Sequence, residues 1–346
     1  MRSLFYCLLF ALPFTALRPS PDFVISETSW QKEKIGEIII KSASLPRLLH
    51  DAVKWTTQRL IMSQLYPAQN SIRKWNTLRF QAKHLADERE LIAHELALKN
   101  FEYKHVILEK NGLRFSAFAI SHKDHAENGK WALQATGNKG PIEKHAIDYA
   151  QQYHKINYNL LLVNGPGVGL SEGSATPKTS GSAQEAGIRY LEEVIGAKKI
   201  VLAGFSLGGA AIGQAILSHQ FRKDKEYLVI RQMTFDRTSN ILKHYAKVLY
   251  PYLKPFVGQI VRWSDCEMDS VAASKKLSEL EIPEVIIQAG NQTAFTDDGI
   301  IPTKSTLGYR LLKEGLGDYT KQFHRIHDAI HVIPFEHTLG AISNWN

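Results

Sequence analysis

The sequence is poor in the features that mark several classes of protein. It has 2 cysteines in 346 residues, which excludes a disulfide-rich scaffold. The cysteines do not have Cys-x-x-Cys spacing and the histidines include no His-Glu-x-x-His pattern, so the sequence predicts no metal site. No apolar run reaches the roughly 20 residues that a membrane-spanning helix needs. What is present is an ordinary globular composition, 44% hydrophobic and 22% charged.

The net charge of +8 raises the question of a nucleic-acid partner. Lysines and arginines are, however, scattered among acidic and apolar residues. Even the dense cluster at 222–225 contains Asp224. The sequence therefore predicts a solvated basic surface and no nucleic-acid partner.

Residues 1–20 form an apolar N-terminal segment that contains Arg2. Its apolar run, 4–17, has the length of the core of a secretory signal, although Phe14 is untypical of a cleavage site. Two roles stay open: a signal or membrane tether, and a short helix packed on the protein. The first predicts an exported or membrane-associated protein with a membrane surface as partner, and the second a cytoplasmic one.

The rest of the chain divides into two parts by its hydrophobic pattern. In residues 21–100 apolar side chains recur at helical spacing, which predicts a helical extension. Residues 101–346 alternate between strand and helix patterns, beginning with a hairpin at Asn111-Gly112. Further strands are predicted at 131–135, 159–163, 200–203, 227–230, 285–288 and 331–334, with helices at 142–154, 183–195 and 210–219. This order predicts a mainly parallel sheet covered by helices on both faces.

The most informative motif is Gly-x-Ser-x-Gly at 204–208, with Ser206 at its centre. An apolar, β-favouring run precedes it and a helix of small apolar residues follows, which is the setting of a nucleophile elbow. A serine at such a sharp turn needs small neighbours. The helix that starts there directs its free N–H groups at a developing oxyanion. We therefore predict that Ser206 is a nucleophile and that the Leu207 N–H is one donor of an oxyanion hole.

A serine nucleophile needs a base, and the base needs an acid that orients it. In this setting the chain order is serine, acid, histidine. Asp298 follows the predicted strand 285–288, and ligands bind beyond the carboxyl ends of strands in such sheets. Asp298 is therefore the predicted acid, and Asp297 is the alternative.

The base must follow the acid in the sequence. The histidines in that region are His324, His327, His331 and His337. His337 lies on the loop after the predicted strand 331–334, from which it can reach over the elbow, so it is the predicted base. His327 is the alternate.

Two glycine-containing loops complete the predicted site. The loop 135–140, between a strand and a helix, supplies the second oxyanion donor, from Gly137 or Asn138. The loop 164–173 lacks the Gly-Lys-Ser/Thr of a phosphate-binding loop, so we expect a rigid loop beside the site and no nucleotide. Aromatic and aliphatic residues at 240–281 contact either an acyl chain or the core.

From about residue 105 to its end, the chain resembles the α/β-hydrolase superfamily. The segments that carry the resemblance are the elbow 204–208, the oxyanion loop 136–140, the Gly-x-Gly-x-Ser loop 164–173, the acid region 298–302 and His337. The loop 164–169 together with Gly-x-Ser-Leu-Gly-Gly is similar to a set of hydrolase-like proteins known from Chlamydia and Legionella, some of which are delivered to host cells. The sequence departs from the superfamily at Thr136, where a histidine is usual, and in its longer stretch 291–296.

The resemblance and the residues imply one activity with one rival. The chain is expected to be a serine hydrolase, of esterase, lipase or thioesterase type, that cleaves a small-molecule or lipid acyl substrate through an acyl-enzyme. This chemistry needs no cofactor. The rival is a catalytically silent α/β-hydrolase-like binding or effector protein, because fold alone does not establish activity.

Overall fold

A computed structural model describes residues 51–62, without 53 and 60, and residues 78–345, without 138–140, 250–253, 292, 328 and 332–333. Residues 53–346 belong to one compact unit. The predicted segment 1–20 and most of the predicted extension 21–100 lie outside the described residues. The predicted division at residue 100 stays a prediction. Within the part of the chain that the structure describes, no helix is both long and apolar enough to span a bilayer.

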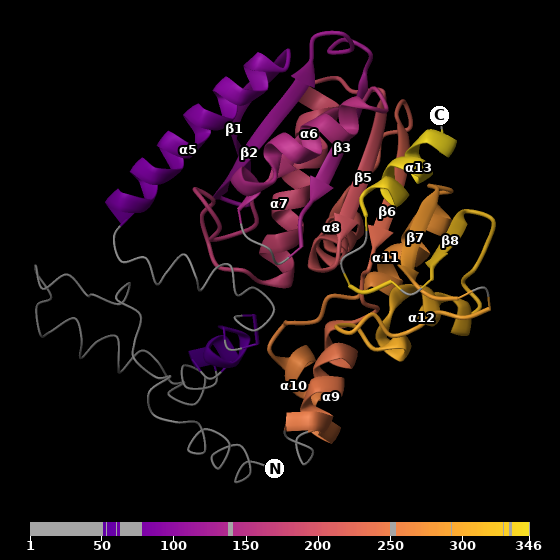
Figure 1. Cartoon of the computed structure of the whole chain (residues 1–346). Helices are drawn as coiled ribbons and strands as arrows, with labels where there is room; N and C mark the ends of the chain where they lie inside the picture. The colour runs from indigo at the N-terminus through magenta and orange to yellow at the C-terminus, as the bar shows by residue number, and fades with distance from the viewer. Residues whose placement is uncertain are drawn as a thin grey trace, which may run out of the picture. The chain divides into compact units, whose positions relative to one another are not determined.

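Eight strands form one sheet in the order β1-β2-β4-β3-β5-β6-β7-β8 (Figure 1). The strands are β1 (Phe101–Lys110), β2 (Leu113–His122), β3 (Lys130–Ala135), β4 (Asn159–Val163), β5 (Lys199–Phe205), β6 (Glu226–Gln232), β7 (Glu284–Ala289) and β8 (Lys321–Ile326). The hairpin β1–β2 turns at Asn111 and Gly112, both with positive φ, as the tight two-residue turn requires. Strand β2 is antiparallel to β4, and the pairs from β4 to β8 are parallel. The predicted mainly parallel sheet is confirmed.

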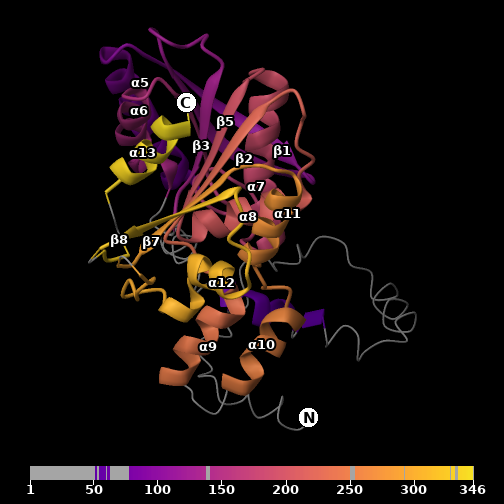
Figure 2. The ribbon, with the colours of Figure 1, turned by 90° about the vertical axis from the view of Figure 1, so that its right-hand side faces the viewer.

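Helices cover both faces of this sheet. The described α-helices are α5 (Leu78–Leu98), α6 (Ala146–His154), α7 (Pro177–Arg189), α8 (Leu207–Ser218), α9 (Thr238–Leu249), α10 (Lys254–Trp263), α11 (Ser270–Glu279), α12 (Leu307–Lys313) and α13 (Glu336–Trp345). Helices α5, α6 and α13 lie on one face, and α7, α8 and α11 on the other (Figure 2). Successive residues of β5 point to opposite faces of the sheet. Val201 packs in the cluster on the face of α5, α6 and α13, and Leu202 in the cluster on the face of α7, α8 and α11.

The predicted strand at 331–334 is wrong. The described residues of that segment, His331 and Pro334, are not in a strand, and the last strand is β8. Strand β8 pairs with β7 at the end of the strand order, so much of it stays partly exposed and its sequence is polar. Its apolar residues Phe323 and Ile326 are three positions apart in the sequence and pack into different apolar clusters. The strand therefore lacks the alternation of apolar and polar residues by which a strand is predicted.

Helices α9 and α10 follow β6 and lie beyond the carboxyl ends of the central strands (Figures 1 and 2). They contribute to an apolar cluster that reaches the start of α8. Its members include Met62, Leu207, Phe235, Ile241 and Val261. This cluster therefore fixes α9 and α10 against the turn that carries Ser206.

Candidate active site

Ser206 lies at a strained turn between β5 and α8. Its φ of 52° and ψ of −118° are unfavourable for a residue with a side chain. The surrounding main chain holds it there, since its N–H donates to the Gln232 carbonyl at 2.8 Å. The hydroxyl of Thr234 lies 3.3 Å from the Ser206 carbonyl, as a second tie to the segment after β6. The predicted strand, turn and helix are confirmed around this serine.

Glycines on both sides of Ser206 allow the turn to pack tightly. A Cβ at Gly204 would lie 2.6 Å from the Gly209 Cα, inside the contact distance. A Cβ at Gly208 would lie 2.6 Å from the Thr136 carbonyl oxygen and closer still to that of Ala135. The motif is therefore required by backbone contact between α8 and the strands β3 and β5.

A chain of hydrogen bonds links Ser206 to a carboxylate through one imidazole. His331 Nε2 lies 2.9 Å from Ser206 Oγ, and His331 Nδ1 lies 2.8 Å from Asp298 Oδ2. Because a carboxylate only accepts, Nδ1 carries the proton and Nε2 offers its lone pair to the serine hydroxyl. The Phe205 ring packs beside His331, with ring centroids 5.3 Å apart. The arrangement is that of a base poised to take the serine proton.

Asp298 is held for this contact by its own loop. The residue is 4% exposed, and its Oδ1 accepts from the N–H groups of Ile300, at 2.9 Å, and Ile301, at 2.5 Å. Asp297 is exposed and accepts from the Gly299 N–H at 2.8 Å, so it stabilises the same turn without contacting the histidine. Of the two predicted acids, the structure therefore brings Asp298 to the serine.

The structure corrects the predicted base: the imidazole between Ser206 and Asp298 belongs to His331, not to His337. His337 lies in the first turn of α13, where it adds to the lowering of the pKa of His324, whose main cause is burial. The alternate, His327, is exposed in the turn directly after β8. The prediction chose the histidine on the loop after the last strand and placed that strand at 331–334. The last described strand ends at Ile326, so the loop after it carries a different histidine, His331.

Two of the three predicted oxyanion donors, Leu207 and Gly137, are among the described residues, and both lie beside the elbow. Leu207 is the first residue of α8, where N–H groups have no partner within the helix. Gly137 follows β3, whose Ala135 pairs with Gly204, and a Cβ at Gly137 would lie 2.8 Å from the Phe205 ring. Asn138 lies outside the described residues.

Polar groups at both ends of the loop 164–173 are hydrogen-bonded within the protein. Asn164 accepts from the Ile142 N–H at 2.9 Å and donates to Glu143 at 3.1 Å. The Ser171 hydroxyl donates to the Asn164 carbonyl at 3.0 Å and accepts from the Ser116 N–H at 2.9 Å. These contacts favour a supporting role for the loop over phosphate binding.

Helix α9 contacts the loop that carries the acid. The Tyr245 hydroxyl donates to the Ile300 carbonyl at 2.8 Å, while Tyr245 stays 39% exposed. Burial raises the pKa of Tyr245, and the charges of Asp298 and Asp297 add to this. Ile300 is 51% exposed, so this edge of the site presents apolar surface.

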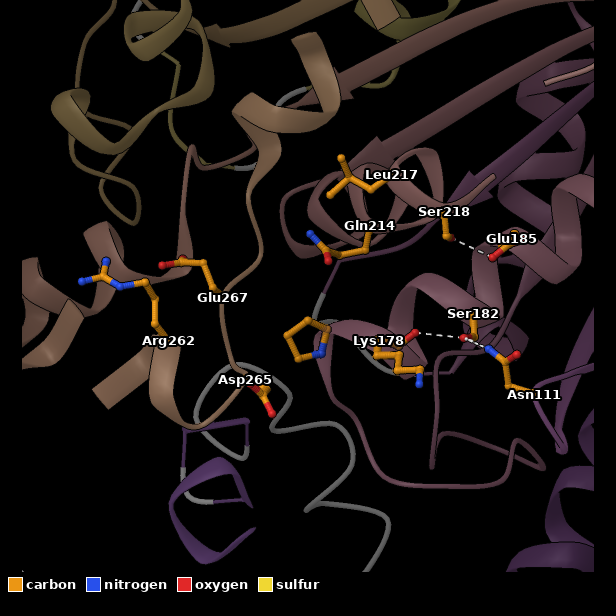
Figure 3. Close-up of a pocket in the computed structure, with 11 residues that line it drawn as sticks. Asn111, Lys178, Ser182, Glu185, Gln214, Leu217, Ser218, Arg262, Asp265 and Glu267 are labelled. Atoms are coloured by element: carbon orange, nitrogen blue, oxygen red, sulfur yellow. Dashed lines mark hydrogen bonds between the residues drawn. The ribbon is translucent and has the colours of Figure 1, made fainter. Parts of the chain in front are cut away.

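An open groove of about 640 Å³ lies elsewhere, along α7 and α8 (Figure 3). Its lining is mostly polar and includes Lys178, Glu185, Gln214, Ser218 and Arg262. Its residues on α8 lie roughly 12–18 Å from Ser206 along the helix, at 1.5 Å per residue. The groove is therefore separate from the hydrogen-bonded serine.

Solved structures that are similar to this chain show its fold. An α/β-hydrolase of Vibrio vulnificus superposes with a TM-score of 0.58 at 18% identity, covering 83% of this chain and 91% of that one. An esterase of Pyrococcus furiosus gives 0.52 at 16% identity, covering 73% of this chain and 92% of that one. The fold is therefore that of the α/β-hydrolases. No curated protein matches the chain. The family model described as Chlamydia CHLPS protein (DUF818) matches residues 37–338.

Proposed function

Since the chain belongs to the family described as Chlamydia CHLPS protein (DUF818), a description that states no activity, we propose its function from the site. The proposed function is that of a serine hydrolase which cleaves an ester, thioester or amide through an acyl-enzyme. The observation that carries it is the position of His331, within 2.9 Å of Ser206 Oγ and 2.8 Å of Asp298 Oδ2. The hydrolase and esterase folds of the two similar structures support the same reaction class.

In this mechanism Ser206 Oγ attacks the substrate carbonyl while its proton passes to His331 Nε2. The imidazolium that forms is stabilised by the Asp298 carboxylate at Nδ1. The tetrahedral intermediate then expels its leaving group, which takes the proton from Nε2. Water, deprotonated by His331, attacks the acyl-enzyme in the second half and releases the acid and the free serine.

Negative charge develops on the carbonyl oxygen in both halves of the reaction. The Leu207 N–H, at the positive end of α8, is the proposed first donor to this oxygen. The loop after β3, which begins with Thr136 and Gly137, is the proposed source of the second. Thr136 stands where many relatives have histidine, so the second donor is a main-chain group.

The complete hydrogen-bond chain favours an enzyme over a catalytically silent binding or effector protein. A binding protein has no need to keep a serine at a positive φ in line with an imidazole and a buried carboxylate. The exposed apolar side chains of Tyr245 and Ile300, beside the acid loop, suit an acyl substrate, either a small molecule or a lipid.

Labelling with a fluorophosphonate probe tests the proposal. The wild-type chain should be labelled, and Ser206→Ala should abolish labelling. His331→Gln should slow it by about 10³-fold or more, since the proton acceptor is lost. His337→Gln is the matched control and should be labelled at the wild-type rate. An unlabelled but folded wild-type protein would exclude the hydrolase, and loss of labelling in His337→Gln alone would reject His331 as base.

A further inference from the structure

Three histidines, two of them three residues apart and the third distant in the sequence, meet far from the proposed active site. His122 ends β2, His125 lies in the turn that follows, and His154 ends α6. One ring nitrogen from each lies within 4.8 Å of those of the other two. His122 and His125 are buried and His154 is half-buried, so the rings form a compact cluster under the β2–β3 connection.

His125 and His154 point one ring nitrogen each at the other, whereas the His122 ring is stacked on His154 with centroids 3.8 Å apart, so His122 has to turn about its side chain to bind an ion that the other two hold. His125 Nε2 and His154 Nδ1 are 3.0 Å apart, so the two atoms share one proton. Two nitrogens bound to a tetrahedral zinc ion at 2.0–2.1 Å are separated by about 3.3 Å. The spacing of this one pair is therefore close to the one that a bound ion imposes, while the three ligand nitrogens together lie within 4.8 Å of one another. His122 uses Nδ1 to accept from the Asp124 N–H at 3.2 Å, which leaves Nε2 for a ligand.

Asn159 supports the orientation of His125. Its Nδ2 lies 3.3 Å from the His125 carbonyl, and its side chain is close enough to influence the His125 pKa. The Asn159 Oδ1 is buried and has no hydrogen-bond partner at ordinary distance, and the same is true of His125 Nδ1. When Nε2 binds a metal, Nδ1 carries the proton, and a neighbouring amide oxygen is the acceptor that metal-bound histidines use.

Neutral imidazole is a ligand for zinc and similar borderline divalent ions, whereas magnesium and calcium prefer oxygen.

We propose that His122, His125 and His154 form a binding site for a divalent transition-metal ion of the zinc type, with the remaining coordination position filled by water. The site joins the β2–β3 connection to the end of α6. Its Cys-free pattern, His-x-x-His followed by a distant third histidine, differs from the spacings by which zinc sites are usually found, which is why the sequence predicts no metal.

The site is independent of the proposed hydrolase reaction. His122 lies at the edge of the sheet where β4 begins, because β2 runs antiparallel to β4 and Ile120 pairs with Leu160. Ser206 follows the other end of the neighbouring parallel strands, roughly 20 Å away for a strand of this length. Metal bound here does not reach the serine.

The experiment uses the full chain, purified without a histidine tag and dialysed against EDTA. Zinc titration followed by calorimetry and elemental analysis should give one ion per chain. A 100-fold excess of zinc over its dissociation constant should raise the melting temperature by about 5 °C. Cobalt should give the strong visible absorption of a low-symmetry site of nitrogen and oxygen ligands.

Variants separate this site from adventitious binding and from misfolding. His154→Gln, at the half-buried position, should weaken zinc binding by at least about 100-fold. His244→Gln, at an exposed position on α9, is the matched control and should bind zinc like wild type. Both should keep wild-type labelling of Ser206, which reports a folded protein. Equal zinc affinity in wild type and His154→Gln, or less than about one-tenth of an ion per wild-type chain, would overturn the proposal.

Discussion

Adjacent carboxylates with the same chemistry have different surroundings at the proposed site. Asp298 is buried, accepts two main-chain N–H groups with Oδ1 and faces His331 with Oδ2. Asp297 is exposed and holds only its own turn. Burial and geometry, more than residue type, therefore favour Asp298 as the proposed acid.

Replacing each aspartate by asparagine tests this assignment. Asp298→Asn keeps the oxygen that accepts from Ile300 and Ile301 but turns an NH₂ group toward His331 Nδ1. The imidazole then favours the tautomer with its proton on Nε2, which cannot accept the serine proton, and kcat should fall by about 10⁴-fold. Asp297→Asn should stay near wild type. Hydrolysis of a p-nitrophenyl ester measures both, and a similar loss in the two variants would contradict the assignment.

The sequence singled out Ser206 and Asp298, which the structure links through hydrogen bonds, but not His331, which lies between them. A nucleophile elbow is a local pattern, and its turn, glycines and helix follow one another in the chain. The acid also follows a recognisable buried strand, β7. The proposed base lies on a loop whose position in the sequence depends on where the preceding strand ends. Four histidines follow the proposed acid in the sequence. Only three-dimensional contact distinguishes among them.

At the scale of elements, burial decides which strands the sequence reveals. The central strands β4 and β5 are covered on both faces and read as apolar runs, so they were predicted closely. Strand β8, with Lys, Gln, His and Arg among its six residues, is held by pairing with β7 instead. The prediction shifted this strand to 331–334 and moved the base with it, to His337.

Helix α8 packs against β3 and β5 so closely that Gly208 has no room for a side chain. Gly208→Ala should destabilise the protein by about 3 kcal/mol or displace the elbow, since the contact is with main-chain oxygens that cannot rotate away. Gly340→Ala, in the exposed middle of α13 with open space around it, should stabilise the protein by about 0.5–1 kcal/mol. Urea unfolding measures both changes. Equal changes in the free energy of unfolding would show that helix propensity, not packing, determines the effect of the substitution at Gly208.

At the scale of the whole molecule, one buried ionic group ties together elements that are distant in sequence. Arg231 of β6 donates from Nε to Glu284 of β7 at 2.6 Å, and Lys321 of β8 lies 3.4 Å from the same carboxylate. Arg231 also donates to the Ser270 carbonyl of α11 at 2.9 Å. The three charged side chains are fully buried. No local pattern predicts such a group, because charged residues are normally read as surface.

Glu284 is the only negative charge in this group, so its removal leaves two buried cations facing each other. Glu284→Gln keeps the shape of the side chain and should lower the free energy of unfolding by about 3–5 kcal/mol. The matched control is Glu193→Gln, which removes an exposed pair with Arg189 and should change stability by less than about 1 kcal/mol. Urea unfolding at neutral pH compares the variants with wild type. A loss below about 1 kcal/mol in Glu284→Gln would mean that Arg231 and Lys321 do not depend on this charge, and the role of the buried group in linking β6, β7 and β8 would be rejected.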